Sequence, residues 1–211
     1  MDVELSSQPS QAQHAGRGDR VARTREAIVA STLTLAMEGE VAPIVRDIAK
    51  LAGVSARTVF QHFADTAELY VAVLGRVLST LASDPPAKGG TGNQGGALDE
   101  RISAAIGQRA GRYEKLVPMW TFVETLQRRS SEAGEKVTQL YTTNREQIAQ
   151  SFGEELTALP GDSREHTLNA VAMTLTPEGW IVLRERLGLT VEQAREEWRF
   201  IVKAIFRDQS R

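Results

Sequence analysis

The chain reads PIVRDIAKLAGVSARTVFQHF at residues 43–63, and this stretch decides the fold of its amino-terminal part. Four apolar residues in its first half follow the i, i+3, i+4, i+7 spacing of one helix face: Val45, Ile48, Ala49 and Ala52. Gly53 comes directly after them and predicts the end of this helix, because glycine tolerates a positive φ. Ser55 is a good N-cap for a second helix. The stretch therefore predicts two short helices joined by a tight turn.

The second helix of this pair is predicted to have one buried and one exposed face. Val54, Val59 and Phe63 are expected to point inward. The polar side chains that fall on the other side are Arg57, Thr58, Gln61 and His62. Two short helices joined by a glycine-containing turn form a helix-turn-helix, whose second helix enters the major groove of DNA.

The polar face has side chains that can recognise base pairs. Arginine donates two hydrogen bonds to guanine, glutamine pairs in the same way with adenine, and threonine or histidine can bind phosphate oxygens. The face of Arg57, Thr58, Gln61 and His62 therefore indicates a surface that reads DNA. The alternative is a solvated polar face on an ordinary helical hairpin.

Residues 44–69 resemble the amino-terminal DNA-binding domain of the TetR family of one-component transcriptional repressors. The matching residues are Ile48, Ala49, Ala52, Gly53, Val54, Ser55, Thr58, His62, Phe63 and Leu69. The resemblance implies DNA contacts from the following residues: Arg46, Ser55, Ala56, Arg57, Thr58, Phe60, Gln61, His62 and Thr66. It also implies a dimer that binds a double-stranded, palindromic operator.

Three positions depart from the family pattern. Phe60 stands where the family usually has tyrosine, Thr66 where it has lysine, and Ile44 where a threonine often caps the first helix of the pair. Each departure removes a phosphate contact or a residue that supports one. Phosphate contacts supply most of the non-specific affinity for DNA, so this part of the affinity is expected to suffer more than base recognition.

Composition places the chain among ordinary globular proteins. It has 211 residues, 41% of them hydrophobic, a net charge of −2 and no cysteine. The charge argues against a protein that coats nucleic acid, and the absence of cysteine excludes disulfides and thiolate metal sites. The chain has no apolar run of about 18 residues and no signal-peptide pattern at its start, so we expect a cytoplasmic protein without membrane insertion.

Four segments are predicted along the chain. Residues 1–19 read as a disordered tail, and residues 20–82 as a three-helix head followed by a connecting helix that Asp65 and Glu68 would cap. Residues 83–96 contain two prolines and five glycines and are predicted to form a flexible loop. Residues 97–211 show only helical periodicity and are predicted to form a larger regulatory and dimerisation domain, which makes the fold all-α.

The carboxyl-terminal helices carry the predicted subunit interface. Thr176 with Pro177 predicts a helix start, and Thr190 with Gln193 predicts a capping box for the last helix. That helix has an apolar seam formed by Val191, Ala194, Trp198, Ile201, Val202 and Ile205. The resemblance implies dimerisation through the last two long helices, so residues 164–187 and 190–206 are predicted to form the homodimer contact. The alternative is that the seam closes the core of its own domain.

Aromatic residues of the larger domain suggest a site for a small molecule. The predicted effector contacts are Trp120, Phe122, Tyr141 and Met173, with Glu124 or Asn144 as a polar partner. The alternative is that these residues are plain core. The resemblance implies an effector pocket in this domain but does not identify the effector, which we expect to be small and apolar or aromatic.

These observations predict a ligand-responsive repressor rather than an enzyme. His14, His62 and His166 lie far apart in the sequence, without a catalytic or metal-binding pattern around them. No catalytic residue, metal or cofactor is therefore expected. The alternative function is a dimeric helical interaction protein whose helix-turn-helix no longer binds DNA.

Overall fold

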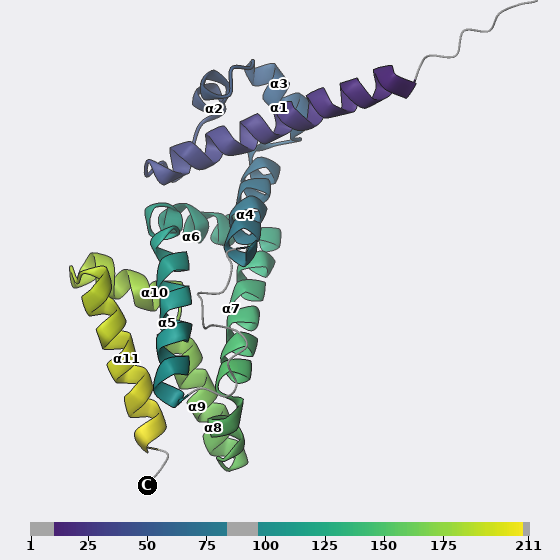
Figure 1. The fold of residues 1–211 in the computed structure, drawn as a ribbon. Helices are drawn as coiled ribbons and strands as arrows, with labels where there is room; N and C mark the ends of the chain where they lie inside the picture. Colours follow the sequence, from purple (N-terminus) through teal and green to yellow (C-terminus); the bar gives the residue numbers. More distant parts are fainter. Residues whose placement is uncertain (1–10, 84–96, 209–211) are drawn as a thin grey trace, which may run out of the picture. The chain divides into compact units, whose positions relative to one another are not determined.

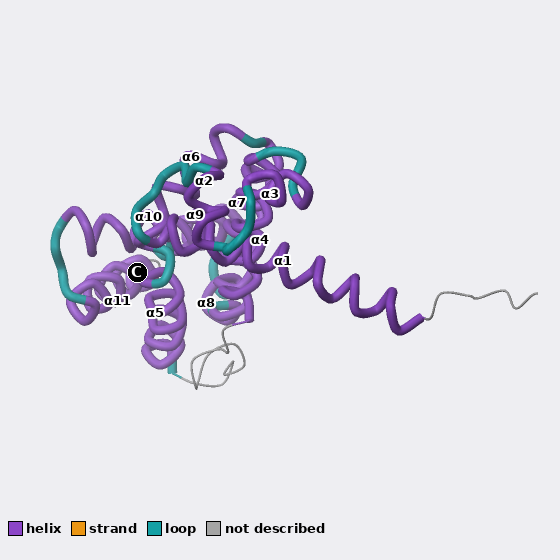
Figure 2. Tube along the Cα trace, turned by 90° about the horizontal axis from the view of Figure 1, so that it is seen from above, coloured by secondary structure: helices purple, strands orange, loops and turns teal. Residues whose placement is uncertain are grey.

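A computed structural model describes residues 11–83 and 97–208, and every regular element in them is helical (Figure 1). Figure 2 shows these residues as helices joined by loops, without a strand. The predicted all-α fold is confirmed. The chain divides into two compact units, one ending at Val73 and the other beginning at Leu74. This division falls inside a helix, α4 (Thr66–Ser83), whereas the sequence suggested a boundary at the end of that helix.

The first unit is a small helical head. It contains α1 (Gln11–Met37), α2 (Val45–Leu51), α3 (Ala56–His62) and the beginning of α4. Helix α1 packs against both α2 and α3, as Figure 1 shows. Buried residues from all four helices and from the end of α3 form its core: Ile28, Ile48, Val59, Phe63 and Leu69. The predicted three-helix arrangement, with α2 and α3 as the helix-turn-helix, is confirmed.

Helix α1 begins earlier than the sequence suggested. It starts at Gln11, so residues 11–19 belong to a helix and the prediction of a disordered tail over 1–19 is wrong for them. Residues 1–10 lie outside the described part. The segment lacks apolar periodicity, but glutamine, alanine and arginine are good helix formers, and a helix anchored by packing further along can extend by one hydrogen bond per residue. Val21, in the part of α1 that follows this extension, is 50% exposed.

The local signals of the helix-turn-helix act as predicted. Gly53 has a φ of +68°, in the region that favours glycine. The Ser55 hydroxyl accepts a hydrogen bond from the Thr58 N–H (3.0 Å) and so caps α3. At the start of α4, the Asp65 carboxylate accepts from the Glu68 N–H (2.8 Å), while the Glu68 carboxylate accepts from the Ala64 N–H (2.7 Å). This arrangement resembles a capping box, except that the Glu68 carboxylate accepts from the N–H of Ala64 instead of that of the capping residue Asp65.

The second unit is a bundle of helices around an aromatic core. After the end of α4 it contains α5 (Leu98–Glu114), a 3₁₀ turn η1 (Val117–Met119), α6 (Trp120–Arg129), α7 (Ser131–Ser151), α8 (Gly153–Thr157), α9 (Gly161–Thr174), α10 (Pro177–Ile181), a π-helical turn η2 (Val182–Arg186) and α11 (Val191–Asp208). Helix α5 packs against α11, α6 against α7, and α9 against both α7 and α11. Tyr113, Trp180 and Trp198 form one aromatic cluster, with ring centroids 6.2 Å apart for Tyr113 and Trp198 and 4.7 Å for the two tryptophans.

Two predicted helix starts in the second unit are confirmed. The Thr176 hydroxyl accepts a hydrogen bond from the Gly179 N–H (3.1 Å), and Pro177 is the first residue of α10. Thr190 and Gln193 form the predicted capping box: each side chain accepts a hydrogen bond from the backbone N–H of the other residue, at 3.2 and 2.8 Å.

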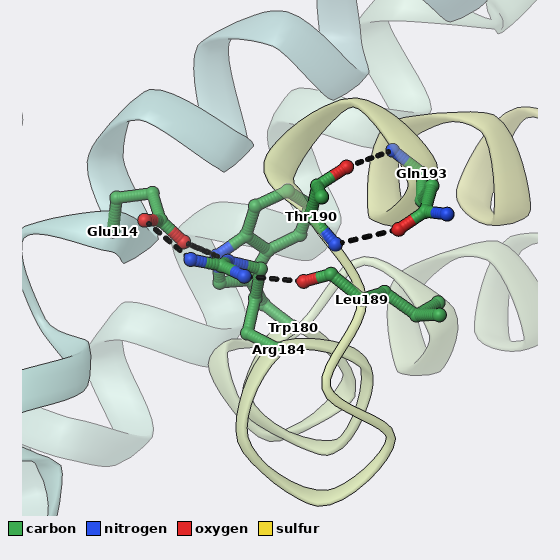
Figure 3. A network of polar contacts seen from close by, with 6 residues as sticks. All are labelled: Glu114, Trp180, Arg184, Leu189, Thr190 and Gln193. Carbon is green, nitrogen blue, oxygen red and sulfur yellow. Dashed lines mark hydrogen bonds and ion pairs between the residues drawn. The ribbon is translucent and has the colours of Figure 1, made fainter.

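A polar network joins α5 to the turn that precedes α11 (Figure 3). The Glu114 carboxylate accepts hydrogen bonds from the Trp180 indole N–H (2.6 Å) and from Arg184 Nε (2.7 Å), and Arg184 also donates to the Leu189 carbonyl. Partial burial alone would raise the pKa of Glu114, but the hydrogen bonds from Arg184 and Trp180 outweigh it and hold that pKa below its ordinary value. The network fixes the position at which α11 begins.

The capping box of α11 gives a test of stability. Replacing Thr190 by Ala removes the acceptor for the Gln193 N–H, and we expect the free energy of unfolding to fall by about 1 kcal/mol. Denaturant unfolding followed by tryptophan fluorescence measures this change, because Trp120, Trp180 and Trp198 all belong to the second unit. Thr142→Ala is the matched control: Thr142 is exposed within α7, and alanine there should leave stability unchanged or slightly higher. An equal effect of the two substitutions would contradict the role of the cap.

Candidate functional site

Helix α3 has one buried and one exposed side, as the sequence predicted. Val59 and Phe63 are each 1% exposed. Arg57 and Gln61 are exposed on the other side, one helical turn apart. Val54, expected inside, is half-buried. The structure therefore brings the predicted base-reading side chains onto one outward surface.

The hydroxyl groups at the start of α3 contact each other. The oxygen atoms of Ser55 and Thr58 lie 2.8 Å apart, in addition to the backbone bond that caps the helix. Thr58 and His62 are half-buried, so each presents only part of its side chain. A hydroxyl has two acceptor lone pairs and one donor hydrogen. A phosphate oxygen at this position would compete with the contact between the two hydroxyls.

The remaining predicted DNA contacts surround α3. Ala56 is exposed, and Phe60 is 52% exposed, which is high for a large apolar side chain. Arg46 is exposed on α2 and forms an ion pair with the neighbouring Asp47 at 3.2 Å. Thr66, the first residue of α4, is half-buried. All nine predicted residues thus belong to the first unit, and only Thr58, His62 and Thr66 are partly covered.

Sequence analysis missed a residue that holds the end of α3 in place. The guanidinium of Arg25, on α1, lies 4.3 Å from the centre of the Phe63 ring and forms an ion pair with Glu68 of α4 at 3.7 Å. Arg25 therefore contacts the residues at the end of α3 and the beginning of α4. No spacing rule joins residues so far apart in the sequence, so only the structure reveals this contact.

A second long-range contact holds the beginning of the helix-turn-helix. The Tyr70 hydroxyl, on α4, donates a hydrogen bond of 2.6 Å to the carbonyl of Pro43, just before α2. The bond fixes the chain at the entry of α2 relative to α4. Together with Arg25 it ties both ends of the helix-turn-helix to neighbouring helices of the same unit.

Five of the six predicted effector contacts are buried or half-buried within the second unit. Trp120, Phe122 and Asn144 are buried, and Tyr141 and Glu124 are half-buried. The buried indole N–H of Trp120 has no hydrogen-bond acceptor among the described residues. Met173, by contrast, is 73% exposed, so its prediction as an interior pocket residue is wrong. It lies two residues from the buried Val171, on the outer side of α9, because helix faces repeat every three to four residues.

The polar residues of this group already have partners within the unit. The side chain of Asn144 accepts a hydrogen bond from Arg109 Nε (2.7 Å) and donates one to the Leu175 carbonyl (3.2 Å). Tyr141 donates to the carboxylate of Glu178 in α10. Burial raises the pKa of Tyr141, and the hydrogen bond to Glu178 and its negative charge raise it further, so this phenol remains protonated.

A surface cleft lies elsewhere in the second unit. It has a volume of about 570 Å³ and is lined by residues of α5, α7, α8 and their ends: Arg101, Gln150, Ser151, Gly153, Glu154, Thr157 and Ala158. None of the six predicted effector residues lines it. Arg101 and Glu154 form an ion pair of 2.9 Å at its wall, and Arg101 also contacts Glu155.

Half of the apolar seam predicted for dimerisation faces the interior, while Val191, Ile201 and Ile205 are half-buried. Ala194, Trp198 and Val202 are at most 1% exposed and pack within their own unit, so the assignment of these residues to a subunit contact is wrong. Periodicity marked the apolar stripe of this helix but not whether its own core or a second subunit covers it. Its outer side carries Phe200, which is 71% exposed.

Metal sites and membrane-spanning helices are both absent from the described residues. No group of three or more histidine, aspartate or glutamate side chains within 11–83 and 97–208 is arranged to hold a metal ion. Within the same ranges, no helix has the length and apolar character needed to cross a membrane.

Comparison with known proteins adds independent observations. Residues 28–73 match the family model of bacterial regulatory proteins of the tetR family. The fold is similar to that of a transcriptional regulator from Rhodococcus sp. Rha1, with a TM-score of 0.68, 17% identity, and coverage of 87% of this chain and 96% of that chain. A candidate TetR-family transcriptional regulator from Mesorhizobium loti MAFF303099 gives a TM-score of 0.63, 16% identity, and coverage of 89% and 97%.

A third similar structure is a candidate transcriptional regulator from Pseudomonas aeruginosa PAO1, with a TM-score of 0.59, 20% identity, and coverage of 90% of this chain and 92% of that chain. No curated protein sequence matches the chain significantly. At these identities the solved structures establish the fold alone, while the family model covers the helix-turn-helix. The matched residues 28–73 identify this part of the chain as a helix-turn-helix domain of the tetR family of bacterial regulatory proteins, within an all-helical fold shared with these regulators.

Proposed function

We propose that this protein is a ligand-responsive transcriptional repressor that binds a palindromic operator as a homodimer. One observation supports this proposal more than any other: the burial of Val59 and Phe63 turns Arg57 and Gln61 of α3 outward. A helix with this arrangement fits the major groove, where its exposed side chains meet base edges.

The proposed DNA contacts divide into base contacts and phosphate contacts. Arg57 would donate to guanine and Gln61 would pair with adenine. The proposed phosphate contacts are the exposed Arg46 and Ser55 and the half-buried Thr58, His62 and Thr66. Ala56 and Phe60 offer only apolar contact. Because a tyrosine and a lysine of the family pattern are absent, fewer phosphate contacts would support each subunit, and the affinity would fall less steeply with salt than in a protein that has both contacts.

The proposed dimer is formed by the outer sides of the last helices. A palindromic operator requires two copies of α3 about 34 to 36 Å apart, which a two-fold dimer supplies. Large apolar side chains are exposed on α9, η2 and α11 and in the turn between them: Met173 (73%), Val182 (48%), Leu187 (63%) and Phe200 (71%). These residues lie within the ranges 164–187 and 190–206, and exposed apolar groups of this size are typical of contacts between subunits.

The effector is proposed to act by population shift. A small molecule that binds the second unit more tightly in one arrangement of the dimer would favour that arrangement and release the operator. The unpaired indole N–H of Trp120 supports an effector site among the predicted residues that include Glu124, Tyr141 and Asn144. Helix α4 belongs to both units and would transmit the change.

The same proposal assigns the protein no catalytic reaction and places it in the cytoplasm, where bacterial DNA lies. A dimeric interaction protein that has lost DNA binding is the second candidate, because Phe60 and Thr66 remove two phosphate contacts of the family pattern. Salt dependence distinguishes the two candidates, since phosphate contacts make DNA affinity fall steeply as salt increases.

The proposed base contact of Arg57 can be tested directly. Replacing Arg57 by Ala should weaken binding to an operator selected from random duplexes by about 1–3 kcal/mol and relax the base preference at one position per half-site. Fluorescence anisotropy at several salt concentrations measures the affinity, and repeated selection with the variant measures the preference. Arg129→Ala removes the same charge from an exposed position of the second unit and should change neither. Unchanged affinity and preference in Arg57→Ala would refute the assignment of α3.

The proposed subunit contact can be tested in the absence of DNA. Phe200→Glu would bury an unpaired carboxylate between subunits, so the dimer dissociation constant should rise by about a hundredfold or more. Analytical ultracentrifugation at micromolar concentration measures this constant. The control is Val21→Glu, which places the same charge at an exposed apolar residue of the first unit. A wild-type protein that is monomeric at this concentration, or a variant with unchanged dimerisation, would contradict the proposed interface.

A further inference from the structure

The core of the second unit contains an arginine without a counter-charge. Arg109 is 1% exposed, and its three hydrogen bonds all go to neutral oxygens. Nε donates to the side-chain oxygen of Asn144 (2.7 Å), Nη1 to the Ala105 carbonyl (3.1 Å) and Nη2 to the Asn144 carbonyl (3.4 Å). Across residues 11–83 and 97–208, no carboxylate forms an ion pair with it. Burying a cation in this way is unfavourable, because buried charges are normally paired.

A second buried arginine of the same helix shows the usual solution. Arg101 is 7% exposed, and its guanidinium pairs with Glu154 at 2.9 Å and with Glu155. Arg101 and Arg109 lie two turns apart on α5, so the same helix buries one compensated and one uncompensated guanidinium. The lack of a carboxylate partner is therefore specific to the position of Arg109 and is not shared by the other buried arginine of α5.

The groups that face Arg109 do not supply a negative charge. Its ionisable neighbours are Tyr113 and Arg112. Burial raises the pKa of Tyr113, which keeps its phenol neutral, and its hydroxyl donates to the Leu175 carbonyl at 3.2 Å. Arg112 adds a second positive charge. Burial lowers the pKa of Arg109, but arginine remains protonated in proteins at neutral pH. The Glu178 carboxylate acts on Tyr113 rather than on Arg109, so the position of Arg109 carries net positive charge and is shielded from water.

Arg109 and Arg112 also have N–H groups that lack a hydrogen-bond acceptor. A guanidinium has five N–H groups, and the three bonds of Arg109 leave about two of them unmet. The Nε–H of Arg112, one turn further along α5, is buried and has no acceptor in the described part of the chain. Unmet donors beside an uncompensated charge are the complement of an anion, and a carboxylate can accept two parallel N–H bonds from one guanidinium.

The surroundings of this position are aromatic. The Tyr113 ring contacts Trp198 edge-on, with centroids 6.2 Å apart, and Trp198 contacts Trp180 at 4.7 Å. Tyr141, a predicted effector contact, lies close enough to Tyr113 for the two phenols to influence each other's ionisation. A ligand that brings its anionic group to Arg109 would therefore place the rest of its body among aromatic and aliphatic side chains.

We propose that Arg109 and Arg112 form an anion-binding point in the core of the second unit, and that the effector is a small aromatic carboxylic acid bound as its carboxylate. The role as effector rests on the proposed repressor function, whereas binding of the acid does not. The site differs from the polar contacts expected from the sequence, because Asn144 acts as the neutral group that occupies Arg109 when no acid is bound.

Acid binding would disturb a defined set of contacts. A carboxylate at Arg109 competes with the side-chain oxygen of Asn144, whose amide also holds the Leu175 carbonyl at the end of α9. Tyr113 donates to the same carbonyl. Binding therefore alters the junction between α9 and α10, and α9 carries Met173 of the proposed subunit contact.

The experiment uses the full-length protein without DNA and two matched pairs of probes. Benzoate and phenylacetate carry the carboxylate, while benzamide and phenylacetamide are neutral molecules of nearly the same shape. Calorimetric titration and thermal denaturation should show that the acids bind wild-type protein and raise its melting temperature, and that the amides do neither. Arg109→Gln retains a hydrogen-bonding side chain without the charge and should weaken acid binding by about tenfold or more.

Two further variants separate anion binding from a structural role. Arg101→Gln removes the compensated buried arginine of α5 and should leave acid affinity at the wild-type value even if it lowers stability. Arg109→Lys keeps the charge without the two-pronged geometry, so its acid affinity should lie between those of wild-type protein and Arg109→Gln. If Arg109→Gln does not fold, the acid affinity of Arg109→Lys tests the site instead. Wild-type protein that binds neither acid, amides that bind as well as acids, or variants of Arg109 with unchanged acid affinity would overturn the proposal.

DNA binding is measured separately, so that the two proposals can fail independently. Release of a selected operator by benzoate or phenylacetate, and loss of this release in Arg109→Gln, would support the role as effector. Acid binding that leaves operator affinity unchanged would keep the anion site but refute its coupling to DNA. Protein that binds the acids and no DNA at all would refute the repressor function and leave the anion site standing.

Discussion

Val59 and Phe63 are each 1% exposed, and because both lie on one side of a seven-residue helix and its end, their burial determines where every other side chain of α3 points. A helix of this length is not stable alone and depends on the residues that pack against it. Arg25 of α1 covers the Phe63 ring and pairs with Glu68 of α4, so two neighbouring helices hold the end of α3. A rotation of α3 by one residue, about 100°, would expose Val59 and turn Arg57 toward the core. The cost of exposing apolar surface and burying a charge therefore fixes the outward polar face.

Features that depend on neighbouring residues could be predicted from the sequence. The turn at Gly53, the cap at Ser55 and the capping box of Thr190 and Gln193 each involve backbone or side-chain groups within four residues of one another. The chemistry of such a signal is complete in the local sequence, so tertiary context rarely changes it. The inward side of α3 follows for a similar reason, because a short helix with few large apolar residues has only one possible buried face.

Features that depend on contacts between distant residues could not be predicted. The bonds from Arg25 to Phe63 and from Tyr70 to Pro43 join different helices, and no periodic pattern indicates them. Helix α11 shows a different difficulty, because it has apolar residues on two sides. Trp198 and Val202 face the core while Phe200 faces outward. Periodicity marks the apolar stripe of such a helix, but it does not say whether the core of the same subunit or a second subunit covers that stripe. The start of α1 was missed because its first residues have helix-forming character without any buried face.

The break between α9 and α10 connects the buried polar groups of the second unit. Leu175 follows the last residue of α9, and its carbonyl accepts hydrogen bonds from Tyr113 of α5 and Asn144 of α7, which together replace the helical bond that α9 cannot make there. Asn144 is bonded to Arg109 at the same time, because its oxygen accepts from the guanidinium while its NH2 group donates to the carbonyl, so one amide side chain links the two groups. Buried networks of this kind are stable only when each member has a partner, and a change at one member must be accommodated by the others.

An apolar core would absorb a ligand by small shifts of many side chains, whereas this network can respond by exchanging a few specific hydrogen bonds. The buried arginine thus weakens the core in isolation and provides two alternative bonding patterns, which is the property that a ligand-operated switch requires.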